Sequence, residues 1–525
     1  MELYNVHNVL DFPILSLAIF LPTFGALIIW LFIKNDNMVR WAALLTSVAT
    51  FIVTLPLIFS FDKTTSHMQF EEFHPWISAV NINYHLGVDG ISMPFIVLTG
   101  LLIIICIGSA WKCIQTRVKE YMVSFLILET TLIGVFSALD VMLFYFFWEA
   151  LLIPMYLMIG VWGGKNRVYA TFKFFLYTLA GSVLMLVALL AMYFEAGHTF
   201  SMLDLMNYKF DFQWQFWIFI AFFIAFAVKV PMWPVHTWLP DAHTEAPTAG
   251  SVILAGILLK MGAYGYLRFS LPMLPDASQY FAPMMIGLSL VAIVYISLVA
   301  MMQRDMKRLI AYSSIAHMGF VTLGTFVFTQ QALEGAVIGM ISHGFIAAAL
   351  FLCVGVMYDR LHTREISDYG GVANVMPVFA VIMLLFSMAN IALPGSSAFI
   401  GEIMVLIGTF AADPSELVIS AKWIAIVATI SVVLSACYTL WMYKRVIMGD
   451  AIKDSVKSMS DITLREFSLF VPLIILTIWV GFYPLPVLDL LHESVAHLVE
   501  QSTTSKLDAA VAVIEHSTAL NAVTH

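Results

Sequence analysis

The sequence predicts an all-α polytopic membrane protein with about fourteen transmembrane helices. Three observations predict this class. Of the 525 residues 61% are hydrophobic, only 11% are charged against about 25% in a typical soluble domain, and the mean hydropathy is +0.91. A soluble protein with so little charge could not cover its surface, so an ordinary soluble enzyme is excluded. The formal net charge of −9 and the scattered basic residues argue against nucleic-acid binding.

A helix that crosses the hydrocarbon core of a bilayer needs about 20 mainly apolar residues. Such runs follow one another along the chain, and we expect a span in each: 14–33, 38–60, 91–111, 120–137, 138–161, 168–194, 215–238, 249–271, 281–301, 309–328, 333–357, 374–411, 417–443 and 466–486. The run 374–411 is interrupted near residue 394, so it is either one broken helix or two short ones. The N-terminus lacks the basic region of a cleavable signal peptide, and we expect the first run to be retained.

The 25 Lys and Arg residues are distributed as this topology requires, because short cytoplasmic loops collect basic residues. One set of loops holds most of them: Lys34, Arg40, Lys112, Arg117, Lys119, Lys165, Arg167, Lys173, Arg304, Lys307, Arg308, Arg360, Arg364, Lys444, Arg445, Lys453, Lys457 and Arg465. The opposite set holds Lys63, Lys209, Arg268, Lys422 and Lys506. A span missed in mid-chain would destroy this asymmetry. Both termini are therefore expected to face away from the cytoplasm.

The two remaining lysines, Lys229 and Lys260, fall in the middle of predicted spans. A charge at the bilayer centre costs about 2.5–3.5 kcal/mol on insertion scales, so each lysine is expected to face a partner or a water-filled cavity. Other titratable groups lie at similar depth: Glu129, Glu149, Glu402, His317 and His343. Lysines and carboxylates that change partners can exchange protons along such a row. The set therefore indicates a proton relay.

Each of these residues also has a structural explanation. Lys229 or Lys260 could form an ion pair that holds helices together, with Glu149 as the partner. The two histidines could each make one interhelical hydrogen bond, and Glu129 could be a lone protonated carboxyl in a helix contact. Several titratable groups in successive spans are rarely all structural, and the relay is favoured for that reason.

Two spans are expected to be broken at membrane depth. Three prolines follow Lys229 within residues 229–240, and a proline inside a helix removes a backbone hydrogen bond and clashes with the preceding turn. The C-terminal half has a counterpart in the Pro-Gly-Ser-Ser segment 394–397, just before Glu402. Broken helices at this depth line cavities, and one in each half of the chain is typical of transporters built from inverted repeats.

The chain is accordingly expected to divide into four parts. Residues 1–119 hold spans 1–3 with an extramembranous loop at 61–90, and residues 120–271 form the first inverted repeat of spans 4–8. Residues 281–443 form the second repeat of spans 9–13. Residues 444–525 hold the last span and a solvated or peripheral amphipathic tail after residue 487.

Cofactor sites have little support in the sequence. The four cysteines, Cys106, Cys113, Cys353 and Cys437, form no CxxC pair, and no nucleotide-binding glycine motif is present. A metal could be held by acidic residues and histidines of one segment: His236, Asp241, His243 and Glu245. A proline at 240 is expected to break the helix that would place the two histidines on one face. Polar lining at the mouth of a half-channel is favoured instead.

Four segments resemble a known family: ALDVMLFYFFWEALLIPMYLMIGVWGG, FAVKVPMWPVHTWLPDAHTEAPTAGSVILAGILLKMGAYG, RDMKRLIAYSSIAHMGF and ALPGSSAFIGE. They are similar to the antiporter-like membrane subunits of respiratory complex I, the proton-pumping NADH:quinone oxidoreductases. The resemblance covers most of residues 85–486. Among the bacterial paralogues it is strongest for the M type, the counterpart of mitochondrial chain 4. Glu402 supports that choice, because L-type chains carry lysine in the second broken helix. L-type chains also have a long lateral helix at the C-terminus, which the 39 residues after the last expected span are too few to supply.

The resemblance implies fourteen spans in two inverted five-helix units, with the seventh and twelfth helices broken. It makes Glu149 and Lys229 the coupled pair of the first half-channel and Lys260 the central relay. It makes the two buried histidines connecting groups and Glu402 the gate of the second half-channel. Glu129 receives no role from it.

The resemblance also implies the surroundings of the chain. NADH, FMN, iron–sulfur clusters and quinone are expected in partner subunits, with no cofactor or metal in this chain. The expected partners are the other membrane subunits of complex I, especially the adjacent subunits L and N, in a bacterial inner membrane. A subunit of a multi-subunit cation/proton antiporter, a ferredoxin- or hydrogenase-linked relative, and a purely structural membrane scaffold remain as alternatives.

Overall fold

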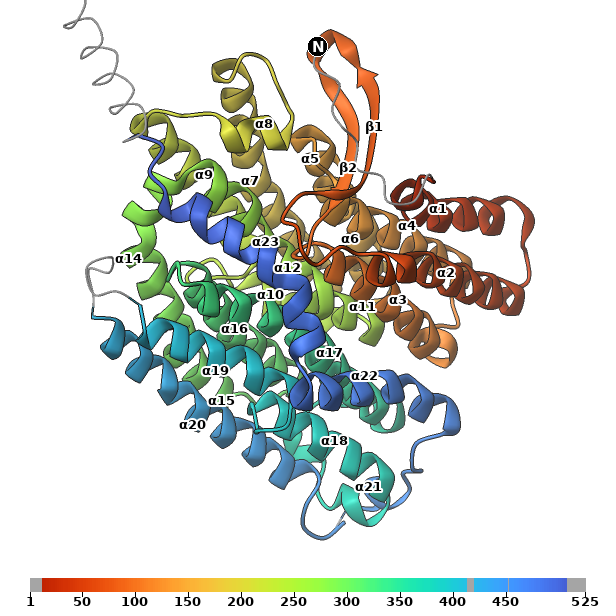
Figure 1. Cartoon of the computed structure of the whole chain (residues 1–525). Helices are drawn as coiled ribbons and strands as arrows, with labels where there is room; N and C mark the ends of the chain where they lie inside the picture. Colours follow the sequence, from red (N-terminus) through yellow and green to blue (C-terminus); the bar gives the residue numbers. More distant parts are fainter. Residues whose placement is uncertain (1–11, 413–419, 452, 508–525) are drawn as a thin grey trace, which may run out of the picture.

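The computed structural model describes residues 12–412, 420–451 and 453–507, which form one bundle of long helices (Figure 1). Twelve helical stretches of this part are long and apolar enough to cross a membrane: α1 (Ile14–Phe32), α2 (Asp36–Phe59), α3 (Met93–Cys113), α4 (Val118–Ser137), Val141–Trp162, α7 (Arg167–Glu195), α9 (Phe212–Lys229), Thr248–Met273, Pro275–Met301, α17 (Gln330–Leu361), α20 (Ala421–Val446) and α22 (Leu464–Phe482). Helix α16 (Met306–Thr325) and the pair α18 (Pro377–Asn390) and α19 (Ser397–Phe410) occupy the two remaining predicted runs. The polytopic all-α fold is thus confirmed.

Both predicted breaks are present. Helix α9 ends at Lys229, and the chain becomes helical again in α10 (Trp238–Glu245). The indole of Trp238 donates to the Val228 carbonyl (2.9 Å), which satisfies one of the acceptors left open where α9 stops. Pro240 does not interrupt a helix, contrary to the prediction, because it lies in the first turn of α10, where backbone N–H groups have no intrahelical partner. The second break separates α18 from α19 at residues 391–396.

Several spans carry irregularities that the sequence analysis did not predict. The span 141–162 divides at Leu151 into α5 (Val141–Ala150) and α6 (Leu152–Trp162), three residues before Pro154. The span that holds Lys260 consists of α11 (Thr248–Ile253), a π-helical segment η2 (Leu254–Leu258), α12 (Leu259–Gly265), a second π segment η3 (Tyr266–Ser270) and α13 (Leu271–Met273). A third π segment, η4 (Ala292–Ile296), joins α14 (Pro275–Val291) to α15 (Ser297–Met301).

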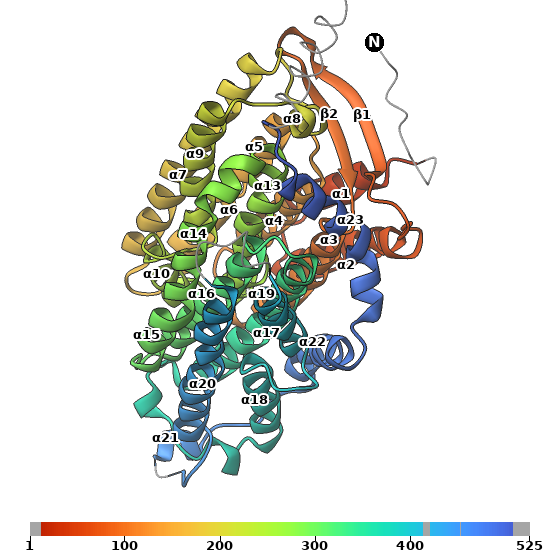
Figure 2. The ribbon, with the colours of Figure 1, turned by 60° about the vertical axis from the view of Figure 1, so that its left-hand side comes forward.

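The extramembranous segment 61–90 is a β-hairpin rather than a loop. Strand β1 (Gln69–Ile77) pairs antiparallel with β2 (Ile82–Val88), and the 3₁₀ turn η1 (Ser78–Val80) connects them. The hairpin and the short helix α8 (Met202–Asn207) lie at one end of the bundle, and α21 (Asp454–Lys457) lies at the opposite end (Figure 2). Alternation of Ile82, Tyr84 and Leu86 is the period-two signal that could have predicted β2.

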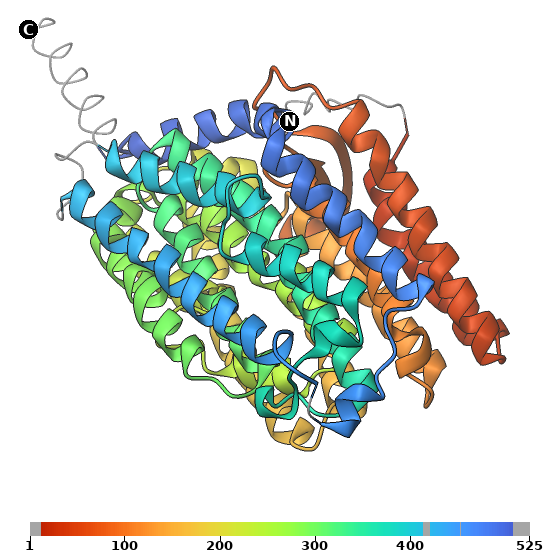
Figure 3. The ribbon, with the colours of Figure 1, turned by 90° about the horizontal axis from the view of Figure 1, so that it is seen from below.

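The part of the tail that the structure describes is an amphipathic helix, α23 (Leu485–Thr503), which lies across the bundle (Figures 1 and 3). Of the two expectations for the tail, solvated or peripheral, the helix fits the second, because Leu491, Val495 and Leu498 are buried. The His492 ring contacts Glu334 of α17 (Nδ1–Oε1, 2.9 Å), and Gln279 of α14 donates to a carbonyl at the far end of α23 (2.8 Å). Residues 508–525 lie outside the described part.

Candidate functional site

Four of the predicted relay residues lie close together and form one cluster. The Lys260 ammonium on α12 lies 2.6 Å from Nδ1 of His343 on α17. The ring centroid of His343 is 5.9 Å from that of His317 on α16, and His317 Nδ1 lies 2.9 Å from Oε1 of Glu402 on α19. The cluster therefore runs from a lysine through two imidazoles to a carboxylate, across four different helices.

A cavity lies beside this cluster, lined by His317, His343, Glu402 and the amide of Asn390 among apolar neighbours. About 30 Å³ of it is open to the centres of water molecules, which is room for roughly two waters. The Nε2 atoms of both histidines are buried without a hydrogen-bond partner among the described residues. Buried polar atoms of this kind are normally satisfied, and the cavity provides the place where water can join the two rings.

Small residues bring the elements of the cluster together. A Cβ on Gly401 would lie 2.7 Å from the Cα of Gly339, and one on Gly335 would lie 2.8 Å from the Cβ of Met404. Because these glycines carry no side chain, α17 and α19 approach backbone to backbone, as is common for helices that pack in a membrane. Glu402 follows Gly401 directly and thus reaches His317.

The Lys260 side chain is held by an irregular stretch of its own helix. Its ammonium also donates to the Ala255 carbonyl, which belongs to the π segment η2. π segments are rare and often occur at functional sites, because they re-aim side chains and loosen the regular ladder of backbone hydrogen bonds. Lys260 is fully buried, so its two partners supply the polar contacts that a buried ammonium requires.

The first broken helix presents a different environment. The Lys229 ammonium lies 5.2 Å from the ring centroid of Trp148 and has no hydrogen-bond partner among the described residues. Glu149, next to Trp148 on α5, lies close enough to Lys229 for the two charges to interact. The predicted pair is therefore close enough to interact, but it forms no direct ion pair here. A cation–π contact takes the place of that pair.

The surroundings of Lys229 meet the cluster around Lys260 where α9 ends. A Cβ on Gly262, in α12, would lie 2.7 Å from the Val230 nitrogen and 2.9 Å from the Cβ of Lys229. The end of the broken helix thus packs against α12 within one turn of Lys260. Lys229 thus lies beside the helix that carries Lys260, and the Lys260 ammonium contacts His343 of the second half.

The aspartates that cap two helices of the site differ in whether a positively charged side chain neutralises the carboxylate. Asp140 begins α5, accepts hydrogen bonds from the Met142 and Leu143 amides (2.9 and 3.2 Å) and receives the Asn83 amide (2.8 Å). Burial outweighs these hydrogen bonds and raises the pKa of Asp140 to about 6. Asp305 begins α16 and, besides capping it, lies 3.3 Å from the Arg364 guanidinium.

Of the residues weighed as metal ligands, the two carboxylates have other partners, whereas both ring nitrogens of His243 and Nδ1 of His236 have no hydrogen-bond partner among the described residues. Asp241 binds the ammonium of Lys173 and the guanidinium of Arg308, each at 2.7 Å. Glu245 accepts the Asn166 amide at 2.9 Å. Within the described ranges no group of three or more His, Cys, Asp or Glu residues is arranged to hold a metal ion. The carboxylates hold together the ends of α7, α10 and α16.

Three buried basic residues, Arg40 in α2, Lys307 and Arg268, were assigned to loops by the sequence analysis and belong to helices instead. Lys307, in the first turn of α16, donates to the Ala246 carbonyl (2.8 Å) and to the Ser251 hydroxyl (3.3 Å). Arg268, in η3, forms a buried ion pair with Asp89. Glu129 is also buried, and its carboxylate has no hydrogen-bond partner in the described chain; it lies outside the connected cluster.

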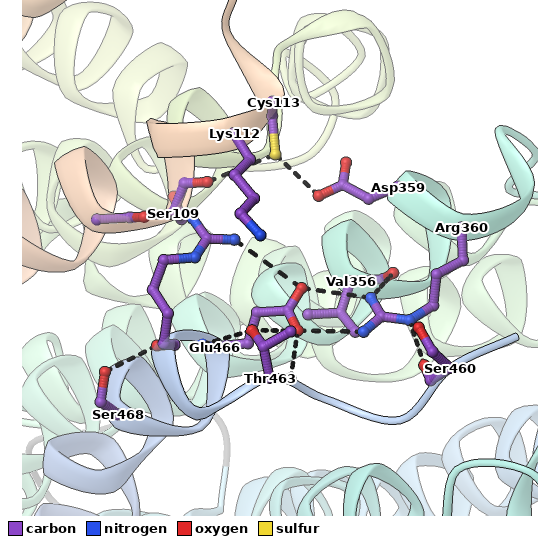
Figure 4. Close-up of polar contacts among 12 residues, drawn as sticks. Ser109, Lys112, Cys113, Val356, Asp359, Arg360, Ser460, Thr463, Glu466 and Ser468 are labelled. Carbon is purple, nitrogen blue, oxygen red and sulfur yellow. Dashed lines mark hydrogen bonds and ion pairs between the residues drawn. The ribbon is translucent and has the colours of Figure 1, made fainter. Parts of the chain in front are cut away.

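A separate polar cluster fastens the ends of α3, α17 and α22 (Figure 4). The Cys113 thiol donates to the Asp359 carboxylate (2.8 Å), and Arg360 binds Glu466 (3.1 Å). The same glutamate closes a capping box with Thr463 at the start of α22. These residues carry no link to the relay, and their contacts are those of an anchor between helices.

Comparison with known proteins decides the family. Residues 138–433 match the family model described as NADH:quinone oxidoreductase/Mrp antiporter, transmembrane. The chain is 52% identical over 505 residues to NADH-quinone oxidoreductase subunit M of Rhodobacter capsulatus, covering 93% of this chain and 96% of that protein. The chain belongs to the NADH:quinone oxidoreductase/Mrp antiporter family.

Within this family the similarity is to subunit M and its mitochondrial-type counterparts. The chain is 46% identical over 489 residues to NADH-ubiquinone oxidoreductase chain 4 of Marchantia polymorpha, covering 93% of this chain and 97% of that protein. Among solved structures, a chain of respiratory complex I from Thermus thermophilus with bound NADH superposes with a TM-score of 0.84 at 28% identity, covering 93% and 99% of the two chains. The family resemblance drawn from the four sequence segments is confirmed.

Proposed function

We propose that this chain is the M-type, proton-translocating membrane subunit of an NADH:quinone oxidoreductase. The observation that carries the proposal is the connected row from Lys260 through His343 and His317 to Glu402, buried in the centre of the bundle beside a cavity. Groups of this kind inside a membrane mark proton paths. The family to which the chain belongs agrees with this function.

The proposed relay begins in the first repeat. A protonated Lys229 lies in the field of Glu149, and when a neighbouring subunit alters that field Lys229 passes its proton towards Lys260. The histidines carry it on, and Glu402 releases it on the far side. Moving one charge across the membrane costs about 2.3 kcal/mol per 100 mV, so a redox reaction in other subunits must supply the energy.

We further propose that the chain consists of inverted repeats at 120–271 and 281–443, flanked by 1–119 and 444–525. In support, each broken helix is the fourth span of its proposed repeat. NADH, FMN, iron–sulfur clusters and quinone are assigned to partner subunits. The adjacent partners are the antiporter-like subunits L and N, and the location is a bacterial inner membrane with both termini on the periplasmic side.

The test is NADH-driven proton uptake by inverted membrane vesicles that carry Glu149→Ala in this chain. NADH oxidation by an artificial acceptor, measured on the same vesicles, verifies that the complex has assembled. We expect pumping to be lost while acceptor activity is retained. Glu129→Ala is the matched control and should leave pumping unchanged, because Glu129 is also a membrane carboxylate but, unlike Glu149, has no interaction with Lys229. Unchanged pumping in the Glu149 variant would contradict the relay and favour a cation/proton antiporter, for which sodium-dependent proton release is the assay.

A further inference from the structure

A second, larger cavity lies at the hairpin end of the bundle, between the hairpin, α8, η3 and α23 (Figure 2). Its volume is about 440 Å³, which at about 30 Å³ per molecule is room for roughly fifteen waters. The cavity reaches the surface of the chain, because its lining residues His67, Asn207 and His497 are exposed. Its lining is largely polar and includes Glu71 and Gln501, so it holds water. We call it the hairpin cavity.

A buried ion pair forms part of the wall of the hairpin cavity. Arg268 of η3 and Asp89, which follows β2, both line the cavity and are only 6% and 2% exposed. Oδ1 of Asp89 accepts from the Arg268 guanidinium and from the backbone amides of Ile91 and Ser92 (3.1 and 2.9 Å). The Nε of Arg268 donates to the Tyr264 hydroxyl (3.2 Å). The guanidinium is therefore held in one position, between a carboxylate and a phenol.

The ion pair lies on the same span as the central lysine of the relay. Lys260, Tyr264 and Arg268 follow one another at intervals of four residues, which places Lys260 and Tyr264 on one face of α12. Eight helical residues correspond to roughly 12 Å along the axis, and a row of roughly four hydrogen-bonded waters bridges that distance. Water in the hairpin cavity thus comes within two turns of Lys260.

We propose that Arg268 is a barrier against the backflow of protons from the hairpin cavity to Lys260, and that Asp89 and Tyr264 hold it in place. A guanidinium cannot be deprotonated in a protein, so Arg268 cannot pass a proton on as a relay member would. Its positive charge also disfavours the entry of hydronium ions, since arginines exclude protons from narrow pores in this way. This role rests on the proposed function, because only a chain that moves protons across the membrane has a gradient to hold.

The test measures passive proton flux, without NADH, through the purified complex in liposomes after a pH jump. The double variant Arg268→Gln/Asp89→Asn removes both charges together, so that no unpaired charge is left buried. We expect the flux to rise about tenfold or more, because a fixed charge at a narrow entrance changes the entry rate of ions by about 10–10³-fold. Lys260→Met, added to the double variant, should return the flux to the wild-type level. NADH oxidation by an artificial acceptor verifies assembly.

The ion pair between Arg360 and Glu466 provides the matched control, because it is also buried and joins two helices but lies away from the hairpin cavity. Arg360→Gln/Glu466→Gln should leave the passive flux unchanged. Equal flux in the two double variants would overturn the barrier and leave Arg268 and Asp89 as a structural pair. A leak that persists after Lys260→Met would overturn the connection to the relay. Normal NADH-driven pumping by Lys260→Met alone would contradict the proposed function itself.

A labelling experiment tests the barrier without changing the ion pair. Gln501 of α23 lines the hairpin cavity and is partly exposed, whereas Ala263 is fully buried, more than one turn deeper in the span than Arg268. A charged thiol reagent, added to the purified complex, should modify Gln501→Cys and leave Ala263→Cys unmodified, as read by mass spectrometry. Modification of both cysteines would show that water and the reagent pass the ion pair, and would overturn the barrier.

Discussion

The two broken helices hold their titratable residues in opposite ways. Lys229, at the end of α9, lies over the Trp148 ring with no hydrogen-bond partner among the described residues, and Glu149 acts on it only through its field. Glu402, in the first turns of α19, is hydrogen-bonded to His317 beside a cavity with room for water. One half therefore holds a cation without a hydrogen bond, and the other holds two hydrogen-bonded pairs with room for water between them.

This difference separates two tasks. A buried cation without hydrogen bonds is poorly stabilised, so a small change in the field of Glu149 shifts its protonation or position strongly. In the second half the bonds of Lys260 to His343 and of His317 to Glu402, with room for water between the two rings, hold the groups in a row along which protons can pass. We infer that the first half responds to the rest of the complex and that the second half conducts.

The largest effect is expected at Lys260, which both halves share. Lys260→Met keeps the volume but removes the donor to His343 and the Ala255 carbonyl. A positioned acid–base group contributes roughly 10²–10⁴-fold to proton transfer, so NADH-driven pumping should fall about a hundredfold. Quenching of a pH-sensitive dye in inverted vesicles measures it, at matched acceptor activity. Pumping at half the normal rate would remove Lys260 from the path.

The close backbone packing beside each broken helix can be tested by replacing one glycine at each break. Gly262→Ala would press a Cβ against the backbone of Val230, and Gly401→Ala would press one against the backbone of Gly339. Overpacking of this kind costs about 1–3 kcal/mol, so both variants should lower the unfolding temperature of the purified complex in detergent. Gly287→Ala is the control, because no atom lies within 4 Å of its added Cβ. A control as unstable as the two variants would refute close packing at the breaks.

A smaller loss is expected at the end of the conducting half. Glu402→Gln retains a hydrogen-bonding group beside His317 but cannot release a proton. Because water in the adjacent cavity can partly replace it, pumping should fall about tenfold, less than for Lys260. Glu334→Gln is the matched control, since Glu334 is a carboxylate of α17 bound to the peripheral His492. Equal losses in both glutamine variants would count against Glu402 as a gate.

The smallest effect concerns the two capping aspartates. The folded pKa of Asp140, about 6, exceeds the unfolded value of 3.8, so its contribution to stability is largest below pH 4 and declines as the pH rises to about 6. Asp140→Asn removes the buried charge and keeps the bonds from the Met142 and Leu143 amides, although it loses the bond from the Asn83 amide. Because burial outweighs these bonds, the unfolding temperature at pH 7.5 should rise by about 2–4 °C. At pH 4.5 the gain should shrink.

Asp305→Asn provides the contrast, because Asp305 is paired with Arg364. Loss of that pair should lower the unfolding temperature at pH 7.5. A higher unfolding temperature of the Asp305 variant would contradict this difference between the two caps. A rise in the unfolding temperature of the Asp140 variant that does not depend on pH would contradict it as well.

The fold was predictable where composition alone decides it. Runs of about 20 apolar residues and the asymmetry of basic loops indicate the spans, and the prolines after Lys229 indicate the first break. The β-hairpin at Gln69–Val88 was missed because its residues were treated as a connection. The π segments around Lys260 were missed because no residue type marks them. The tail 485–503 was left between two expectations because amphipathic periodicity does not reveal which surface a helix covers.

The members of the site were predictable, but their contacts were not. Charged residues in mid-span stand out in a sequence, so Lys229, Lys260 and Glu402 were found. Which of them are hydrogen-bonded depends on long-range packing, such as the approach of α17 to α19 at Gly339 and Gly401. That Lys229 rests on Trp148, rather than directly on Glu149, follows from tertiary structure alone.

The contact of α23 with the N-terminal part of the chain bears on the order of folding. The Gly90 amide donates to the Ser494 hydroxyl at 3.0 Å, across 404 residues of sequence. At roughly 5–20 residues per second, about 20–80 s of synthesis separate the two groups. The segment that follows the hairpin must wait that long for its partner, so a helix synthesised long after the hairpin completes this side of the molecule.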